Sequence, residues 1–371
     1  MYPPNGPAAR LFLCGDVMTG RGVDQILPHP SDPRLHESVL RSALRYVELA
    51  ERAHGAIPRR ADYPYVWGDA LDLLARERPA ARIINLETSI TTSEDAAPKG
   101  INYRMHPANI AVLTAALVDC AVLANNHVLD WGCAGLTDTL DALGGAGIRA
   151  AGAGRALADA QAPAIIDVEG GRVLVFAFGA PDSGIPESWS AAPARPGVHR
   201  IADFSRDTVD RIALLVRAAK RANDVVIASV HWGGNWGYDI DASHRTFAHA
   251  LIEQAAVDVV HGHSSHHPKA IEVHRGHPIL YGCGDFLNDY EGIEPPDGFR
   301  DDLAVMYFPT LDLRTGTLRE LEVVPLRIRR FRLERAPAAD LGWLRDTLDR
   351  ECGRFGHHVT PADDRLVLRW R

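Results

Sequence analysis

One short stretch of this chain combines residues that can bind a metal ion with residues that can transfer a proton. Residues 121–130 read AVLANNHVLD, so an apolar run leads directly into two carboxamides, an imidazole and, three residues later, a carboxylate. Asn126 could give a neutral oxygen to a metal ion, His127 could transfer a proton, and Asp130 could orient that imidazole. The alternative is an asparagine-rich turn with a surface histidine, because short motifs often match by chance.

Polar side chains also follow four other apolar runs, each of which is expected to be a buried strand. They are Asp16 after residues 10–14, Glu87 after 82–86, His231 after 224–230, and His261, His263, His266 and His267 after 257–260. A single histidine on an apolar strand is usually part of the core. Five separate strand ends that finish in oxygen or nitrogen ligands are harder to explain in that way.

Carboxylates, imidazoles and one amide oxygen form the mixed ligand set that borderline divalent ions such as Mn, Fe, Zn or Co prefer. A calcium site would contain oxygen ligands only, and a structural zinc site would favour thiolates. The sequence therefore predicts one or two divalent metal ions as cofactors, with Mn, Fe or Zn as the candidates. Two ions bridged by one carboxylate would activate water and stabilise an in-line displacement.

These residues suggest a division of ligands between two ions. Glu87 is the candidate bridge, and Asp16 with one histidine of the 263–267 cluster would hold one ion. Asn126, His231 and another histidine of that cluster would hold the other ion. In this scheme metal-activated water is the nucleophile, so no serine or cysteine nucleophile is needed.

The remaining polar residues have predicted roles in proton transfer and substrate binding. His127 protonates the leaving group, and Asp130 fixes the orientation of His127 and raises its basicity. Arg21 and Arg104 are candidates for binding substrate oxygens. The alternative for these two arginines is a surface position, because the chain is rich in arginine.

Alternating strands and helices predict an α/β fold that can position these residues. Apolar or alternating runs predict strands at 10–14, 82–86, 101–106, 121–124, 148–151, 164–168, 172–178, 224–230, 257–260, 269–274, 278–281, 303–313 and 317–324. Helical spacing predicts helices near 37–52, at 65–76, 107–117, 135–143, 207–222 and 243–255, and near 339–351. In open α/β sheets the loops at the carboxyl ends of strands carry the functional side chains. The polar residues described above occur at these positions.

Charge and composition exclude several classes of protein. The formal net charge of −8 argues against a nucleic-acid partner, which would require a concentrated basic surface. Residues 152–154 (GAG) lack the third glycine of a dinucleotide loop, and no phosphate loop occurs. No apolar run approaches about 18 residues, and the five cysteines form no CxxC pair. We therefore expect a cytoplasmic protein without a membrane partner.

Several motifs in order along the chain resemble the CapA family, the poly-γ-glutamate capsule synthesis domain. The segments are GDVMTGRG, NLET, LANNHVLDWGCAGLTDTLDALGGAGI, AGAGRAL, VHWGGNWG, VDVVHGHSSHHPKAIEV and ILYGCGDFLNDYEG. The resemblance implies the four-layer α/β/β/α sandwich of the calcineurin-like metallophosphoesterase type. It predicts a domain at residues 9–326, followed by a helical, arginine-rich C-terminal extension at 327–371.

The resemblance also implies roles for individual residues. Asp16, Glu87, Asn126, His231, His263 and His266 correspond to metal positions, His127 corresponds to the catalytic histidine, and His267 is left as a substrate-binding candidate. Classical phosphoesterases of this fold carry DxH after the first strand, and Met18 stands at that histidine position here. The motif GHSSHHPK also departs from the more frequent GxHPH, so the choice of ligands among its histidines stays open.

These observations lead to one principal hypothesis about function and two alternatives. The principal hypothesis is a metal-dependent hydrolase that acts on a phosphoester or an amide-linked substrate, either a small molecule or an anion derived from a polymer. The first alternative is a non-catalytic component of a poly-γ-glutamate-type polymer synthesis complex, whose ligase would be another chain. The second is a relative that keeps the fold without a function at this site.

Overall fold

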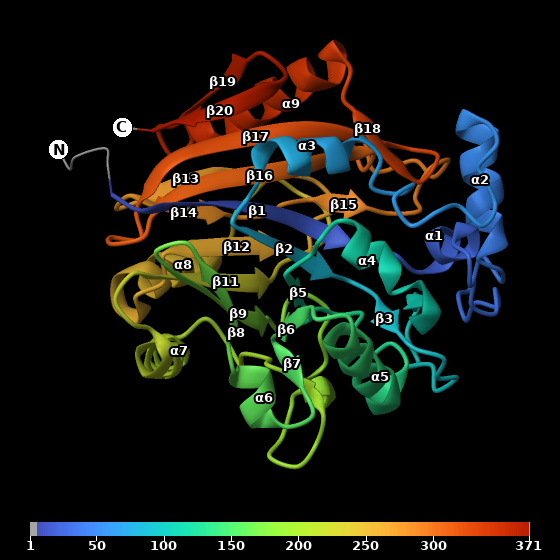
Figure 1. Cartoon of the computed structure of the whole chain (residues 1–371), viewed down its shortest axis with the longest axis horizontal. Helices are drawn as coiled ribbons and strands as arrows, with labels where there is room; N and C mark the ends of the chain where they lie inside the picture. Colours follow the sequence, from blue (N-terminus) through green and yellow to red (C-terminus); the bar gives the residue numbers. More distant parts are fainter. Residues whose placement is uncertain (1–5, 371) are drawn as a thin grey trace.

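The computed structural model describes residues 6–370, in which two β-sheets pack face to face (Figure 1). Ten strands form the first sheet, in which the adjacent strands β1, β2, β5 and β6 run parallel and β6 lies at the edge. Along the sheet the order is β19 (His358–Ala362), β20 (Arg365–Arg369), β17 (Leu318–Arg329), β16 (Leu303–Asp312), β1 (Ala8–Val17), β2 (Ala81–Leu86), β5 (Cys120–Val122) and β6 (Arg149–Ala151). In addition, β15 (Asp285–Leu287) pairs with β1, and β18 (Arg332–Arg335) pairs with β17.

Six strands form the second sheet, which contains a parallel centre and an antiparallel hairpin at each edge. The order is β13 (Ile271–His274), β14 (His277–Leu280), β12 (Val259–His263), β11 (Asp224–His231), β9 (Gly171–Gly179) and β8 (Ala164–Val168). Two small sheets pair β3 (Ser89–Ile90) with β4 (Arg104–Met105) and β7 (Ala153–Gly154) with β10 (Gly197–Val198). The strands expected at 164–168 and 172–178 are confirmed as β8 and β9, which pair antiparallel.

Helices cover the outer faces of both sheets. On the second sheet, α7 (Arg206–Ala219) and α8 (Ala242–Ala255) bury Ile212 and Phe247 against Phe176 of β9. On the first sheet lie α3 (Asp69–Glu77), α4 (Ala111–Ala115) and α5 (Gly132–Gly145), whose apolar side chains join the large core. The layer order is the expected four-layer α/β/β/α sandwich (Figure 1). Shorter segments are α1 (Arg21–Ile26), α2 (Leu44–His54), η1 (Pro107–Asn109), α6 (Leu157–Gln161) and η2 (Glu187–Trp189).

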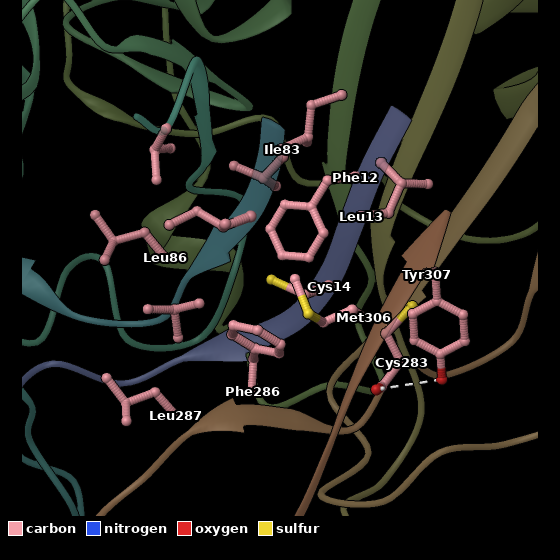
Figure 2. Packing of buried hydrophobic residues seen from close by; sticks show 14 of the residues in the cluster. Phe12, Leu13, Cys14, Ile83, Leu86, Cys283, Phe286, Leu287, Met306 and Tyr307 are labelled. Carbon is pink, nitrogen blue, oxygen red and sulfur yellow. Dashed lines mark hydrogen bonds between the residues drawn. The ribbon is translucent and has the colours of Figure 1, made fainter. Parts of the chain in front are cut away.

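Strand β1 is buried on both of its faces, which explains its unbroken apolar sequence. Leu11, Phe12, Leu13 and Cys14 are all buried, as is typical of a central strand between two packed layers. Figure 2 shows Phe12 close to Phe286, and their ring centroids are 5.6 Å apart. A one-residue shift would exchange the side chains between two packed faces and disrupt the contacts on both. The position of its carboxyl end is therefore well determined.

The C-terminal residues differ from the separate extension that the sequence led us to expect. Strand β17 continues through residue 326 to Arg329, and β20 pairs with β17 within the first sheet. Helix α9 (Ala338–Gly353) buries Leu344 and Leu348 in the same core as the sheets. The sequence RLVLR at 365–369 forms β20, which lies between β17 and the edge strand β19 and buries Leu366, Val367 and Leu368. Residues 327–370 are therefore part of the sandwich.

Candidate metal centre

The predicted site residues come together where parallel strands of both sheets end. Asp16 lies at the end of β1, Glu87 directly after β2, and Asn126 shortly after β5. His231 and His263 are the last residues of β11 and β12, and they lie opposite each other in the parallel register. The two sheets meet at this point, because His261 Nε2 lies 2.8 Å from the carbonyl oxygen of Cys14.

Two buried carboxylates lie side by side at this edge. The Nδ2 atom of Asn85 donates to Asp16 Oδ1 at 2.7 Å and to Glu87 Oε2 at 3.3 Å. Burial, together with the charge of Asp285, raises the pKa of Asp16 to about 7. Burial and the neighbouring Asp16 raise the pKa of Glu87 as well. A cation between these groups would stabilise their ionised forms.

Histidines from the second sheet face these carboxylates. The Nε2 atom of His231 lies 3.9 Å from Glu87 Oε1, and His263 Nδ1 lies 4.0 Å from Asp16 Oδ1. The Nδ1 atoms of the two histidines are 2.8 Å apart, and Ser229 Oγ lies 2.9 Å from His263 Nε2. Burial lowers the pKa of both imidazoles. They are therefore neutral near pH 7, and a neutral imidazole is the form that binds metal ions.

A divalent metal ion fits the donor atoms that this edge presents. Asp16 Oδ2, Asn126 Oδ1 and His231 Nε2 are buried and have no hydrogen-bond partner in the described part of the chain. Buried polar atoms without a partner are rare because they lose their hydration without compensation. Donor atoms of Asp16, His231 and His263 lie within 4.8 Å of one another, and so do those of Asp16, His266 and Asp285. Both groups thus contain carboxylate and imidazole ligands around Asp16.

His127 is placed to exchange a proton beside these ligands. Its Nδ1 atom lies 2.7 Å from Asp130 Oδ2, as the sequence predicts, and its Nε2 atom lies 3.7 Å from Glu87 Oε1. Burial lowers the pKa of His127 to about 4, although Asp130 acts in the opposite direction. Near pH 7 the ring is therefore neutral.

The family model described as bacterial capsule synthesis protein PGA_cap matches residues 10–290. The chain belongs to this family. The resemblance to CapA proteins inferred from the motifs is thereby confirmed.

Relatives of this PGA_cap chain carry names that refer to polymer synthesis. A probable polyglutamine synthesis accessory protein of Mycobacterium tuberculosis is 49% identical over 98% of this chain and 96% of that protein. The PGA biosynthesis protein CapA of Bacillus subtilis is 29% identical over 85% of this chain and 70% of its own length. Among solved structures, a phosphatase of Mycoplasma pneumoniae aligns over 91% of this chain and 97% of its own, with 10% identity and a TM-score of 0.48. Within residues 6–370, no helix combines the length and apolar character needed to cross a membrane.

Asp285 and Lys99 are residues of the PGA_cap site that sequence reasoning missed. Asp285 Oδ1 lies 2.8 Å from His266 Nδ1. Burial lowers the pKa of His266, but Asp285 together with Asp16 and Asp301 outweighs burial, so the pKa is raised. Lys99 Nζ donates to Asp130 Oδ1 at 2.8 Å and to the carbonyl oxygen of Asn126. The position of Asp285 soon after a buried strand, in GCGD, was a usable signal. The polar segment around Lys99 contained no comparable sequence signal.

Two predicted substrate-binding arginines of this PGA_cap chain are engaged elsewhere. Arg21 is 3% exposed, and its guanidinium donates to Asp289 and Glu37. Arg104 is also buried, and it donates to the carbonyl oxygen of Ser93 and to the carboxylate of Glu94. Both guanidinium groups are engaged by protein partners, so the structure does not support the predicted role in binding substrate oxygens. The alternative of a surface position is wrong, because both side chains are buried. Their carboxylate partners compensate for the loss of water around a buried charge.

His267, the third predicted substrate-binding residue, lies in an aromatic cluster. Its ring is 4.6 Å from Tyr238 and 4.6 Å from Phe299, measured between centroids, and it stacks on Trp236 at 6.0 Å. The residue is buried, and its side chain does not belong to either group of metal donors. Its neighbour His266 instead points to Asp285. The structure thus separates two histidines that the sequence alone left as alternatives.

A cavity of about 540 Å³ opens next to the PGA_cap site. Its walls include Lys99, Gly184, Ile185, Pro186 and Trp189. Lys99 connects this cavity to His127, because Nζ lies 3.3 Å from His127 Nδ1. This volume lies within the range of small-molecule sites in proteins. Residues between 181 and 189 contribute most of these walls.

Proposed function

We propose that this chain is a metal-dependent hydrolase that cleaves a phosphoester or an amide-linked bond in an anionic substrate. The observation that carries the proposal is the set of three buried, unpartnered donor atoms, Asp16 Oδ2, Asn126 Oδ1 and His231 Nε2. They come from separate strand ends in both sheets. Packing alone does not explain why three such atoms are left without partners at one edge.

The two donor groups support a centre for two ions of Mn, Fe or Zn. His231 and His263 would hold one ion, with Asn126 Oδ1 as a further candidate ligand, and His266 and Asp285 would hold the other. Asp16 belongs to both groups and is therefore the better candidate for the shared ligand than Glu87. When bound, the ions would activate water and stabilise negative charge on the group being transferred.

Asp285 explains how the centre could keep a second ion without the histidine of DxH. Met18 stands at that position, and its sulfur accepts a hydrogen bond from Tyr290 at 3.6 Å. Asp285 pairs with Asp16 in the parallel register of β1 and β15, so its carboxylate approaches Asp16 from the neighbouring strand. Asn288 donates to Asp285 Oδ2 at 2.8 Å and holds the carboxylate in place. A carboxylate would thus replace an imidazole ligand.

His127 would supply the proton for the leaving group. Asp130 accepts from its Nδ1 atom, which leaves Nε2 directed toward Glu87 and the predicted position of the substrate. An anionic substrate beside Nε2 would favour the charged imidazolium, because opposite charges raise the pKa of a histidine. Lys99 would attract the same anion, and the adjoining cavity would accept the remainder of the substrate.

Metal content and hydrolysis measured on the same protein test this proposal. Protein loaded with Mn²⁺, Fe²⁺ or Zn²⁺ is assayed with phosphomonoesters, phosphodiesters and γ-glutamyl anilides. We expect His231→Ala to lose bound metal and His127→Ala to keep metal while activity falls by about a hundredfold or more. His358→Ala is the matched control, because that side chain is 67% exposed. Wild-type protein that binds no metal and cleaves no substrate of the panel would contradict the proposal.

A second candidate function is a non-catalytic component of a polymer synthesis complex. The name of the Mycobacterium tuberculosis relative, an accessory protein of polyglutamine synthesis, favours it. The test is complementation of a strain that lacks the gene, with polymer as the readout. If Asn126→Ala restores polymer as well as wild type does, the accessory role is favoured over the hydrolase.

A further inference from the structure

A second cluster of imidazoles and carboxylates lies between helix α8 and the edge strand β13. His249 and Glu253 are one turn apart on α8, so they lie on the same face of that helix. Glu272 and His274 are two residues apart on β13, so they lie on the same face of that strand. The helix and the strand thus each contribute one imidazole and one carboxylate.

This cluster lies toward the opposite end of the second sheet from the candidate metal centre. Strand β14 runs parallel to β12, and β13 runs antiparallel to β14. His274 pairs with His277 at the amino end of β14, whereas Leu280 at its carboxyl end pairs with His261. The cluster around His274 and the centre around His263 are therefore separate sites.

The four side chains form two crossed pairs. His249 Nε2 of the helix lies 2.9 Å from Glu272 Oε1 of the strand, and His274 Nε2 of the strand lies 2.7 Å from Glu253 Oε1 of the helix. The two imidazole rings are parallel, with centroids 3.8 Å apart. Donor atoms of His249, Glu272 and His274 all lie within 4.8 Å of one another. Two nitrogens and one carboxylate oxygen therefore meet in one small volume, and Glu253 is paired with His274 beside them.

Residues around the cluster hold the carboxylates in position. Tyr281 OH donates to Glu272 Oε2 at 2.7 Å, which leaves Oε1 directed toward the imidazoles. Arg275 Nε lies 2.8 Å from Glu253 Oε1. Such outer contacts orient carboxylate ligands in metal sites. Glu272 is buried, and the two histidines are partly exposed, so an ion could enter from solvent.

We propose that His249, Glu253, Glu272 and His274 bind one zinc ion that joins α8 to β13. Two imidazoles and two carboxylates suit tetrahedral zinc, whose ligand distances are about 2.0 to 2.2 Å. At those distances neighbouring ligand atoms are separated by about 3.3 Å. The paired atoms need to move apart by about half an ångström. The two stacked rings also need to turn toward a common point, because a metal ion lies in the plane of each imidazole that binds it. Each neutral ring would keep its proton on Nδ1, so that Nε2 is free to bind the ion.

Zinc at this position would strengthen an edge of the sandwich. β13 is the edge strand of the second sheet, and its Val273 amide donates to His357 Nε2 at 2.9 Å. His357 follows α9, so this hydrogen bond links β13 to the C-terminal segment. The zinc ion would link the same strand to α8. An ion that binds only the folded state increases the free energy of unfolding. This role is structural and does not depend on the proposed hydrolase activity.

Zinc stoichiometry of the full chain tests the proposal. Protein stripped with chelator is titrated with Zn²⁺ against a chromophoric competitor, and bound zinc per chain is counted. We expect His274→Gln and His249→Gln to lose one zinc equivalent and the thermal stabilisation that this zinc confers. His277→Gln, on the same hairpin but outside the cluster, is the control and should keep both. The same loss should occur in a His231→Ala background, which removes the candidate centre from the count.

Equal zinc stoichiometry in His274→Gln and wild-type protein would overturn the proposal. If the variants do not fold, anomalous diffraction at the zinc edge from wild-type crystals decides the question. A peak among the four side chains supports the site, and its absence in zinc-soaked crystals refutes it. Because these readouts do not involve hydrolysis, failure of this proposal and failure of the proposed function can be distinguished.

Discussion

Replacing Asp130 by asparagine tests how His127 is oriented. The buried carboxylate of Asp130 accepts three hydrogen bonds, from the ring of His127 at 2.7 Å, the amide of Tyr103 at 2.6 Å and Lys99 at 2.8 Å. In Asp130→Asn the same three donors would compete for a single amide oxygen. At least one of them would lose its partner, and the negative charge beside Lys99 would disappear.

The size of the effect follows from these contacts. A hydrogen bond to a charged group contributes about 1.5 to 3 kcal/mol, so we expect the free energy of unfolding to fall by about 2 to 3 kcal/mol. Loss of a carboxylate that orients an active-site histidine typically lowers activity by about 10- to 100-fold. We expect that decrease in kcat with metal content unchanged. Asp130 raises the pKa of His127, so the variant should lower it further.

Three measurements on Asp130→Asn would check this reasoning. They are kcat on the best substrate of the panel, metal content, and the tautomer of His127 by nitrogen-15 NMR. Asp141→Asn is the matched control, because Asp141 lies on α5 and its side chain is 69% exposed. A folded, metal-loaded Asp130→Asn protein with kcat within twofold of wild type would refute the assigned role of Asp130.

Three further predictions concern stability and are measured by urea denaturation. Burial lowers the pKa of His199 from 6.5 to about 4, so the unfolded chain binds the proton first as pH falls. His199 should therefore contribute about 2 kcal/mol to the decrease in the free energy of unfolding between pH 7.5 and 5, and His199→Gln should remove that contribution. Phe286→Ala removes a fully buried ring that packs on Phe12, so it should cost about 3 to 5 kcal/mol; a cost below about 1 kcal/mol would contradict this packing. Arg21→Met leaves the buried carboxylate of Asp289 unpaired and should cost about 3 to 5 kcal/mol, part of which a second change, Asp289→Leu, should restore.

Strand ends and ligand types could be predicted from local sequence because both depend on short segments. Apolar runs at 10–14 and 224–230 mark strands that are buried on both faces, and the polar residue that follows each run lies at the carboxyl edge of its sheet. His127 and Asp130 are three residues apart, and their hydrogen bond forms within a single turn of chain. The boundaries of helices were less accurate. The helix expected near 37–52 begins at Leu44, and the helix expected at 107–117 is divided between η1 and α4.

Which residues meet at the site was decided by pairing between distant segments, and local sequence patterns do not show that pairing. Asp285 meets Asp16 only because β15 pairs with β1, and His266 and His267 are adjacent in sequence but face different surroundings. The C-terminal segment looked peripheral because its arginines suggested solvent, yet Arg365 pairs with Glu77 and Glu322 across the first sheet.

The sequence by itself determined the α/β class, the family, and which residue types stand at the strand ends. Those properties follow from the periodicity and order of residues along the chain. Only the tertiary structure decided that Asp16 is shared by two donor groups and that Arg21 and Arg104 are held away from solvent by carboxylates. The physical reason is that a buried polar group requires a partner, and that partner is supplied by whichever distant segment the packing of the two sheets brings alongside.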